Sequence, residues 1–211
     1  MPTSSPNAAT TYPDALGVIE LGSIVRGHRV LDQMVKRAPV RVRRAYAVSS
    51  GKFLIFVDGG VAELEEALDA GLAAAGERLL GSLLLSSVHP LLWPALDACT
   101  AREHHLGVGM DDEPLDAMGL LESASVVDVI LGVDAALKAA ELRLALLHLA
   151  RSIGGRAYAV LSGGQSDLEA GIEAALARMR EELLIESDVI TAPHDDMTRE
   201  LLGLSTIHPK Y

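Results

Sequence analysis

The sequence predicts an α+β fold built from two tandem copies of a split β-α-β-β-α-β domain, each an antiparallel sheet with its helices on one face. Three observations support this prediction. The two halves of the chain repeat each other, short apolar segments alternate with Ala-rich segments of helical periodicity, and a Gly-Gly pair precedes the second helical segment of each half.

The internal repeat is clearest near the start of each half, where residues 15–20 read ALGVIE and residues 117–122 read AMGLLE. At an offset of 102, identities recur at Ala15, Gly17, Glu20, Ser23, Val25, Asp32, Lys36 and Ala38. A two-residue insertion in the second copy then makes the offset 104, and identities resume at Gly51, Gly59, Gly60, Leu64, Glu65, Ala70 and Ala73. A fixed-period match of this extent indicates a tandem duplication.

The first copy begins with an apolar strand over residues 16–21, and Ser23 is placed to cap the helix that follows. That helix carries small and apolar residues at three- and four-residue spacing through Val30, Met34, Val35 and Ala38. Strands are expected at residues 40–48 and 53–57.

Gly59-Gly60 then opens a second helix whose first turn is acidic, as the positive end of a helix dipole favours. A fourth strand is expected over residues 79–85, followed by a turn at His89-Pro90 and a short helix. The second copy repeats this order, with strands expected at residues 118–123, 142–150, 157–161 and 183–190.

The division into domains follows from the repeat. We expect a disordered tail over residues 1–14, a first domain over 15–97, a polar linker over 98–114 and a second domain over 115–211.

Composition excludes several classes of function. A net charge of −11 argues against a nucleic-acid partner, because phosphate binding needs clustered Lys and Arg. The apolar stretches are interrupted well before the roughly 20 residues of a membrane span. One cysteine, Cys99, excludes an intrachain disulfide framework and, with no visible signal peptide, fits a reducing cytoplasm.

The order of these segments resembles the bacterial microcompartment shell domain. The resemblance rests on the ALGVIE strand, the pattern Asp32-x-Met34-x-Lys36-x-Ala38, a small-residue loop, a strand, Gly-Gly and an Ala-rich helix. It covers residues 15 to about 97 and 117 to about 202, in unpermuted order. The family resemblance implies a structural protein, not an enzyme. It implies a homotrimer that mimics a hexamer and tiles a shell in the cytoplasm together with other shell proteins, with enclosed enzymes as further possible partners.

The resemblance also assigns site residues. The loop between the second and third strands of each domain lines a central pore in the family, and the matching residues here are Ser49, Ser50, Gly51, Lys52, Ile153, Gly154, Gly155 and Arg156. Lys36 and Lys138 match the family lysine at the contact between tiles. Lys52 and Arg156 have two interpretations. They face the opening and favour small anionic metabolites, or they point sideways into salt bridges.

Other chemistry finds little support in the sequence. Some family members hold an iron–sulfur cluster through a pore-loop cysteine, but Cys99 lies at the start of the linker. His104 and His105 are adjacent in that linker and form a poor metal chelate. The Gly-Gly pairs lack the spacing of a phosphate-binding loop, and no nucleophile elbow surrounds Ser49 and Ser50. We therefore expect no cofactor, no metal and no catalysis.

One function of a different class stays open. Split βαβ repeats also serve as regulatory modules, so the alternative is a small-molecule-sensing tandem α+β protein with its ligand between the domains.

Overall fold

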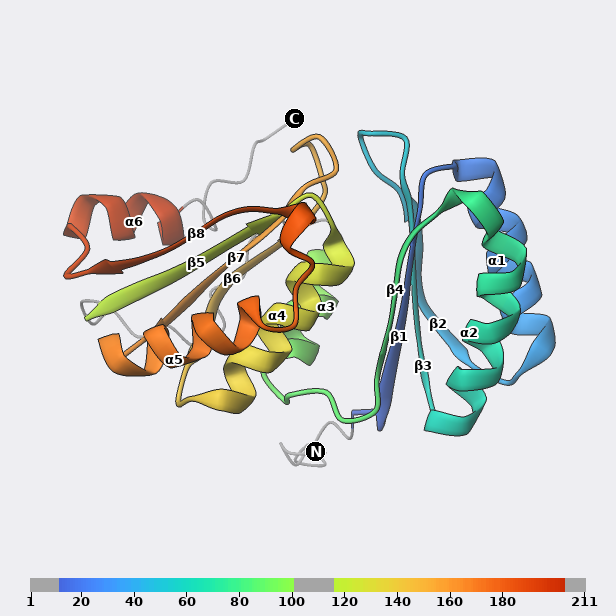
Figure 1. Cartoon of the computed structure of the whole chain (residues 1–211), viewed down its shortest axis with the longest axis horizontal. Coiled ribbons are helices and arrows are strands. Elements are labelled where there is room, and N and C mark those ends of the chain that lie inside the picture. Colours follow the sequence, from blue (N-terminus) through green and yellow to red (C-terminus); the bar gives the residue numbers. More distant parts are fainter. Residues whose placement is uncertain (1–11, 101–115, 204–211) are drawn as a thin grey trace, which may run out of the picture.

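The computed structural model describes residues 12–100 and 116–203 (Figure 1). Most of the expected tail and most of the expected linker, including His104 and His105, lie outside the described residues.

Within the described residues, each repeat contains four strands, two long helices, a short 3₁₀ helix and a final short helix. In the first repeat they are β1 (Ala15–Leu21), α1 (Ile24–Arg37), β2 (Arg41–Ala47), β3 (Phe53–Gly59), α2 (Val61–Ala75), η1 (Gly76–Arg78), β4 (Leu79–Leu85) and α3 (Leu92–Thr100). In the second they are β5 (Ala117–Ser123), α4 (Val126–Ala139), β6 (Arg143–Leu149), β7 (Ala157–Gly163), α5 (Gln165–Leu176), η2 (Glu181–Leu183), β8 (Leu184–Thr191) and α6 (Asp195–Gly203).

Both repeats form the same four-stranded sheet, in the orders β2-β3-β1-β4 and β6-β7-β5-β8. All strand pairs are antiparallel, and equivalent residues hold equivalent registers, as when Ala15 pairs with Gly59 and Ala117 pairs with Gly163. The predicted fold class is confirmed. The last helix of the first repeat, α3, continues to Thr100.

Alternation along the strands builds a core on each face of a sheet, because successive side chains point to opposite sides. In β1, Ala15, Ile19 and Leu21 pack with α1 and α2. Leu16 and Val18 point to the opposite face, where they join a hydrophobic cluster that includes residues of α3 and of the second repeat. Figure 1 shows α1 and α2 on the outer side of the first sheet and α4 on the side that faces the second repeat.

The two repeats differ most in their first helices. Ser23 and Ser125 cap α1 and α4 in the same way, each accepting from the backbone N–H three residues later. Yet α1 buries only Gly27, Val30 and Met34, whereas α4 is buried along most of its length because the first repeat covers it. The α3 helix adds to this contact by lying along β6 while Trp93 packs beneath the Arg43 guanidinium of β2.

Candidate functional site

The two loops expected to line a pore lie against each other in one chain. A Cβ built on Gly155 would lie 2.0 Å from Ser50 Oγ, so only glycine allows this approach. Gly155 also has φ +78°, a conformation that side chains other than glycine adopt at a cost. Arg151, at the start of the second loop, lies over the Tyr46 ring of β2. Each loop is therefore packed on the other repeat.

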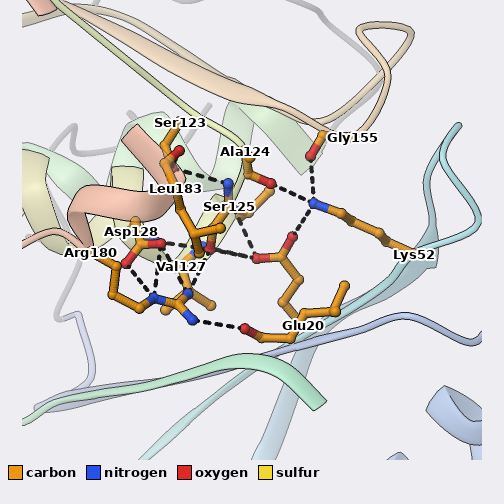
Figure 2. Close-up of polar contacts among 12 residues, drawn as sticks. Glu20, Lys52, Ser123, Ala124, Ser125, Val127, Asp128, Gly155, Arg180 and Leu183 are labelled. Carbon is orange, nitrogen blue, oxygen red and sulfur yellow. Dashed lines mark hydrogen bonds and ion pairs between the residues drawn. The ribbon is translucent and has the colours of Figure 1, made fainter. Parts of the chain in front are cut away.

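The Lys52 ammonium lies in the junction between the repeats. It forms an ion pair with Glu20 at 2.8 Å and donates to the backbone oxygens of Ala124, at 2.5 Å, and Gly155, at 3.0 Å (Figure 2). Two of these three acceptors belong to the second repeat. Its side chain is 18% exposed, so this lysine makes the sideways ion pair that was one of its two interpretations.

Glu20 connects the repeats from the end of β1. It is fully buried, and its Oε2 accepts from Ser125 Oγ at 2.8 Å and from the backbone N–H groups of Val126 at 3.0 Å and Val127 at 3.4 Å. These N–H groups are the unsatisfied donors at the start of α4, where a carboxylate is favoured. Glu20 of the first repeat is thus an N-terminal cap for a helix of the second.

Arg180 completes the junction from the side of η2. Its guanidinium pairs with Asp128 at 2.9 Å, donates to Ser125 Oγ and reaches the Leu80 backbone oxygen in β4 at 3.0 Å (Figure 2). The junction formed by Glu20, Lys52, Ser125, Asp128 and Arg180 therefore satisfies buried charges with partners from both repeats.

The equivalent residues of the second repeat have no such junction in the described chain. Arg156 forms an ion pair with Glu122 at 3.1 Å, and the two side chains are 55% and 36% exposed. Like Lys52, Arg156 therefore points sideways into an ion pair within a single chain.

Residues 15–90 and 117–193 both match the BMC domain family. The chain belongs to this family. Over 89% of its length, it is 32% identical to the bacterial microcompartment shell protein PduT of Citrobacter freundii, of which it covers 97%. It is 29% identical to the carboxysome assembly protein CcmO of Synechococcus elongatus, over 89% of this chain and 68% of that protein.

Solved structures agree with the tandem BMC architecture. A microcompartments protein from Desulfitobacterium hafniense DCB superimposes with a TM-score of 0.71 at 28% identity, over 88% of this chain and 98% of that one. A fused permuted hexameric shell protein of the RMM microcompartment gives a TM-score of 0.56 at 23% identity, over 78% and 80% of the two chains, and shares the fold. This tandem BMC protein is a bacterial microcompartment shell protein.

The two lysines expected at the contact between tiles lie in different surroundings of the BMC domains. Lys36 is exposed and pairs with Asp32 one helical turn earlier, at 2.7 Å, which lowers the pKa of that carboxyl. Lys138 pairs with Asp134 at 2.5 Å and donates to the Ser87 backbone oxygen of the first domain. Lys36 therefore faces outward in one chain, whereas Lys138, near the end of α4, contacts the segment that follows β4 in the first domain.

Asp134 also receives a hydrogen bond from the His89 backbone N–H at 2.8 Å, and the His89 ring accepts from the Leu91 N–H at 3.3 Å. Burial lowers the pKa of His89, so the neutral ring that this turn needs as an acceptor is favoured. A cavity of about 270 Å³ lies nearby, between the end of β4 and α4, with Lys138 and Arg178 on its wall.

Within residues 12–100 and 116–203, no group of three or more metal-binding side chains comes together, and no helix has the length and apolar character that a bilayer span needs. The backbone places Cys99 in α3.

The sequence contained a signal for part of the junction that Glu20 and Ser125 form between the two repeats. Glu20 and Ser23 recur as Glu122 and Ser125 in the repeat, although a strand glutamate gives no sign that it caps a distant helix. Arg180 left no such signal, because the position before η1 in the first domain is Ala75.

Proposed function

We propose that three copies of this BMC protein close into a ring of six domains, and that this ring is one tile of a microcompartment shell with a central opening for small metabolites. The observation that carries the proposal is the contact between the two loops, Ser50 on Gly155, inside one chain. Loops from neighbouring domains that already touch are placed to border one shared opening.

The junction is also of the head-to-tail kind. The strand end of the first domain, with Glu20 and Lys52, meets the helix start of the second domain, with Ser125. A heterologous contact of this type generates a closed ring when its rotation divides a full turn. Two domains in each chain and six around the axis need three chains.

The residues at the opening are proposed to be Ser49, Ser50, Gly51, Ile153, Gly154 and Gly155. Lys52 and Arg156 follow at the base of these loops, where each is paired with a glutamate. Because these ion pairs neutralise part of their charge, the opening presents mainly hydroxyl and backbone groups. Its preference for small anionic metabolites then rests on the residual field of the two cations.

We propose that Lys36 and Lys138 contribute to contact between tiles. Lys36 suits this role best, because its side chain is 68% exposed on the outer helix α1. Other shell proteins are the expected lateral partners and enclosed enzymes the expected contents, in the cytoplasm. The role requires no catalytic residue and no cofactor. Membership of the BMC family favours this function over a small-molecule-sensing module.

Size-exclusion chromatography with light scattering, followed by electron microscopy, tests the proposal. The expected result is a particle of three chains that appears as a threefold hexagonal disc and associates laterally into sheets. A protein that stays monomeric or dimeric at shell-forming concentrations, and never associates laterally, would contradict it.

A further inference from the structure

Two surfaces on opposite sides of the molecule resemble the two sides of the in-chain junction, but neither has its matching surface among the described residues of one chain. One half, the strand side, consists of Glu122, Arg156 and Glu186 in the second domain. The other half, the helix side, consists of the start of α1, residues 23–26, in the first domain. Each half is equivalent to one side of the junction that Glu20 and Ser125 form within the chain.

Strand register establishes the equivalence on the strand side. Glu20 of β1 pairs with Gly81 of β4, and Glu122 of β5 pairs with Glu186 of β8. Glu122 therefore stands where Glu20 stands, Arg156 follows the second loop as Lys52 follows the first, and Glu186 replaces Gly81.

Burial shows that the helix side is incomplete in one chain. Val126 and Val127, at the start of α4, are 0% and 3% exposed because the first domain covers them. Their counterparts Ile24 and Val25, at the start of α1, are 40% and 82% exposed. Among the described residues, the N–H groups of Ile24 and Val25 have no acceptor, whereas those of Val126 and Val127 are bound by Glu20.

The charges of the two halves are complementary. Glu122 and Glu186 lie directly opposite each other on neighbouring strands, an unfavourable arrangement for like charges, and among the described residues only Arg156 forms an ion pair with either of them. On the helix side, Arg26 takes the place that the acidic Asp128 has in α4.

The reversal of charge at this position has a structural reason. In the in-chain junction the cation is Arg180, which pairs with Asp128 and lies against Gly81. Ala75 stands before η1 where Arg180 stands before η2, so α1 receives no such cation from its own domain. A contact with Glu186 in place of Gly81 needs a positive charge on the helix side, and Arg26 supplies it.

We propose that Glu122 of one copy caps α1 of a second copy, accepting from the Ser23 hydroxyl and the Ile24 and Val25 N–H groups. Arg156 holds Glu122 in place, and Glu186 pairs with Arg26 of the second copy. Arg26 keeps its present bond to the Ala74 oxygen, at 3.2 Å, because a guanidinium has five donors. The proposal rests on the ring assembly proposed above and names the residues that close it.

Charge reversal tests the pairing. Arg26→Glu and Glu186→Arg are each expected to raise the trimer dissociation constant by about tenfold or more, since like charges that face each other across an interface weaken binding by at least that factor. The double variant is expected to return to within about threefold of the wild type, because opposite charges face each other again. Mass photometry across a dilution series measures all four constants. Glu65→Arg, on the exposed face of α2, is the control and is expected to match the wild type.

Glu122→Gln provides a separate measurement, at a half-buried position where the substitution keeps the shape of the side chain and removes its charge. It is expected to weaken the trimer and to expose the Ile24 and Val25 amides to hydrogen exchange, while the Val126 and Val127 amides stay protected. If the wild type is a trimer but these variants dissociate as the wild type does, or the double reversal gives no rescue, this inference is overturned and the tile survives. A wild type that never trimerises overturns the proposed function itself.

Discussion

Glu20 shows how a single side chain ties the two domains together. A fully buried carboxylate is stable only when its charge is matched, and Glu20 has the Lys52 ammonium on one oxygen and three donors of the α4 start on the other. Removing the carboxylate leaves the ammonium without its counter-ion and the start of α4 without its acceptor.

Glu20→Ala is therefore expected to lower the free energy of unfolding by about 3–5 kcal/mol, the usual cost of breaking a buried ion pair. For a chain of this size that corresponds to a fall in Tm of roughly 6–20 °C, measured by calorimetry at fixed protein concentration. Glu65→Ala, at an exposed position, is the control, with an expected change within about 0.5 kcal/mol. Equal melting of the two variants would show that Glu20 is dispensable.

His89 predicts a pH dependence of stability. Its pKa in the folded protein is lowered by burial below the ordinary value of 6.5, so between the two values the unfolded chain binds more protons. The stability that neutral His89 provides is then present above about pH 6.5 and is lost as the pH falls below it. The Tm of the wild type minus that of His89→Gln should decrease between about pH 7 and pH 5. A difference that stays constant over that range would mean that His89 titrates alike in the folded and unfolded chains.

At the scale of elements, α1 and α4 occupy equivalent positions in the two repeats but differ in amino-acid composition. Residues of α4 such as Ile130 and Leu137 are buried by the first domain, whereas α1 places His28 and Arg29 at exposed positions. A helix that meets its neighbour inside the chain is apolar along most of its surface. The α1 helix, which we propose meets a second copy, keeps polar residues and exposes Ile24 and Val25 at its start and Val35 near its end.

The strands and helices were predictable because each carries its own local signal. The apolar run of β1, the serine caps of α1 and α4, and the Gly-Gly turns before α2 and α5 gave elements within a few residues of those observed. The direction of Lys52 was not predictable. Its acceptors on Ala124 and Gly155 lie 72 and 103 residues away, and no spacing pattern reports such a contact.

The loop contact can be tested with matched glycines. Gly155→Ala introduces a Cβ that meets Ser50 Oγ, in addition to the strain of a positive φ, whereas Gly154→Ala, at φ +66° with no atom within 4 Å, introduces the strain alone. We expect Gly155→Ala to be less stable than Gly154→Ala by about 1–3 kcal/mol, the usual cost of overpacking. Chemical denaturation of both variants gives the difference.

Adding Ser50→Gly to Gly155→Ala should remove the clash and recover most of that difference. Without such recovery, the cost of Gly155→Ala would have to come from somewhere other than the contact between the loops.

At the scale of the whole molecule, the proposed assembly has two contacts of the same kind that are made by different residues. The in-chain contact uses Lys52, Asp128 and Arg180, and the proposed contact between copies uses Arg156, Glu186 and Arg26. A chain whose two junctions differ cannot exchange one for the other, so the proposed ring has threefold symmetry, and its opening alternates a Ser-Ser-Gly loop with an Ile-Gly-Gly loop.

The opening itself can be tested by adding charge to one of these loops. Ser49 is exposed beside the loop contact, and Ser49→Glu places three carboxylates around a threefold opening. Charges closer together than the Debye length of about 8 Å act strongly on a passing anion, so anion flux through reconstituted shells should fall several-fold. Ser49→Gln has the same bulk without the charge and should slow anions and neutral solutes alike. If both variants passed anions at the same rate, Ser49 would lie away from the route that metabolites take, and the loops would serve assembly instead of transport.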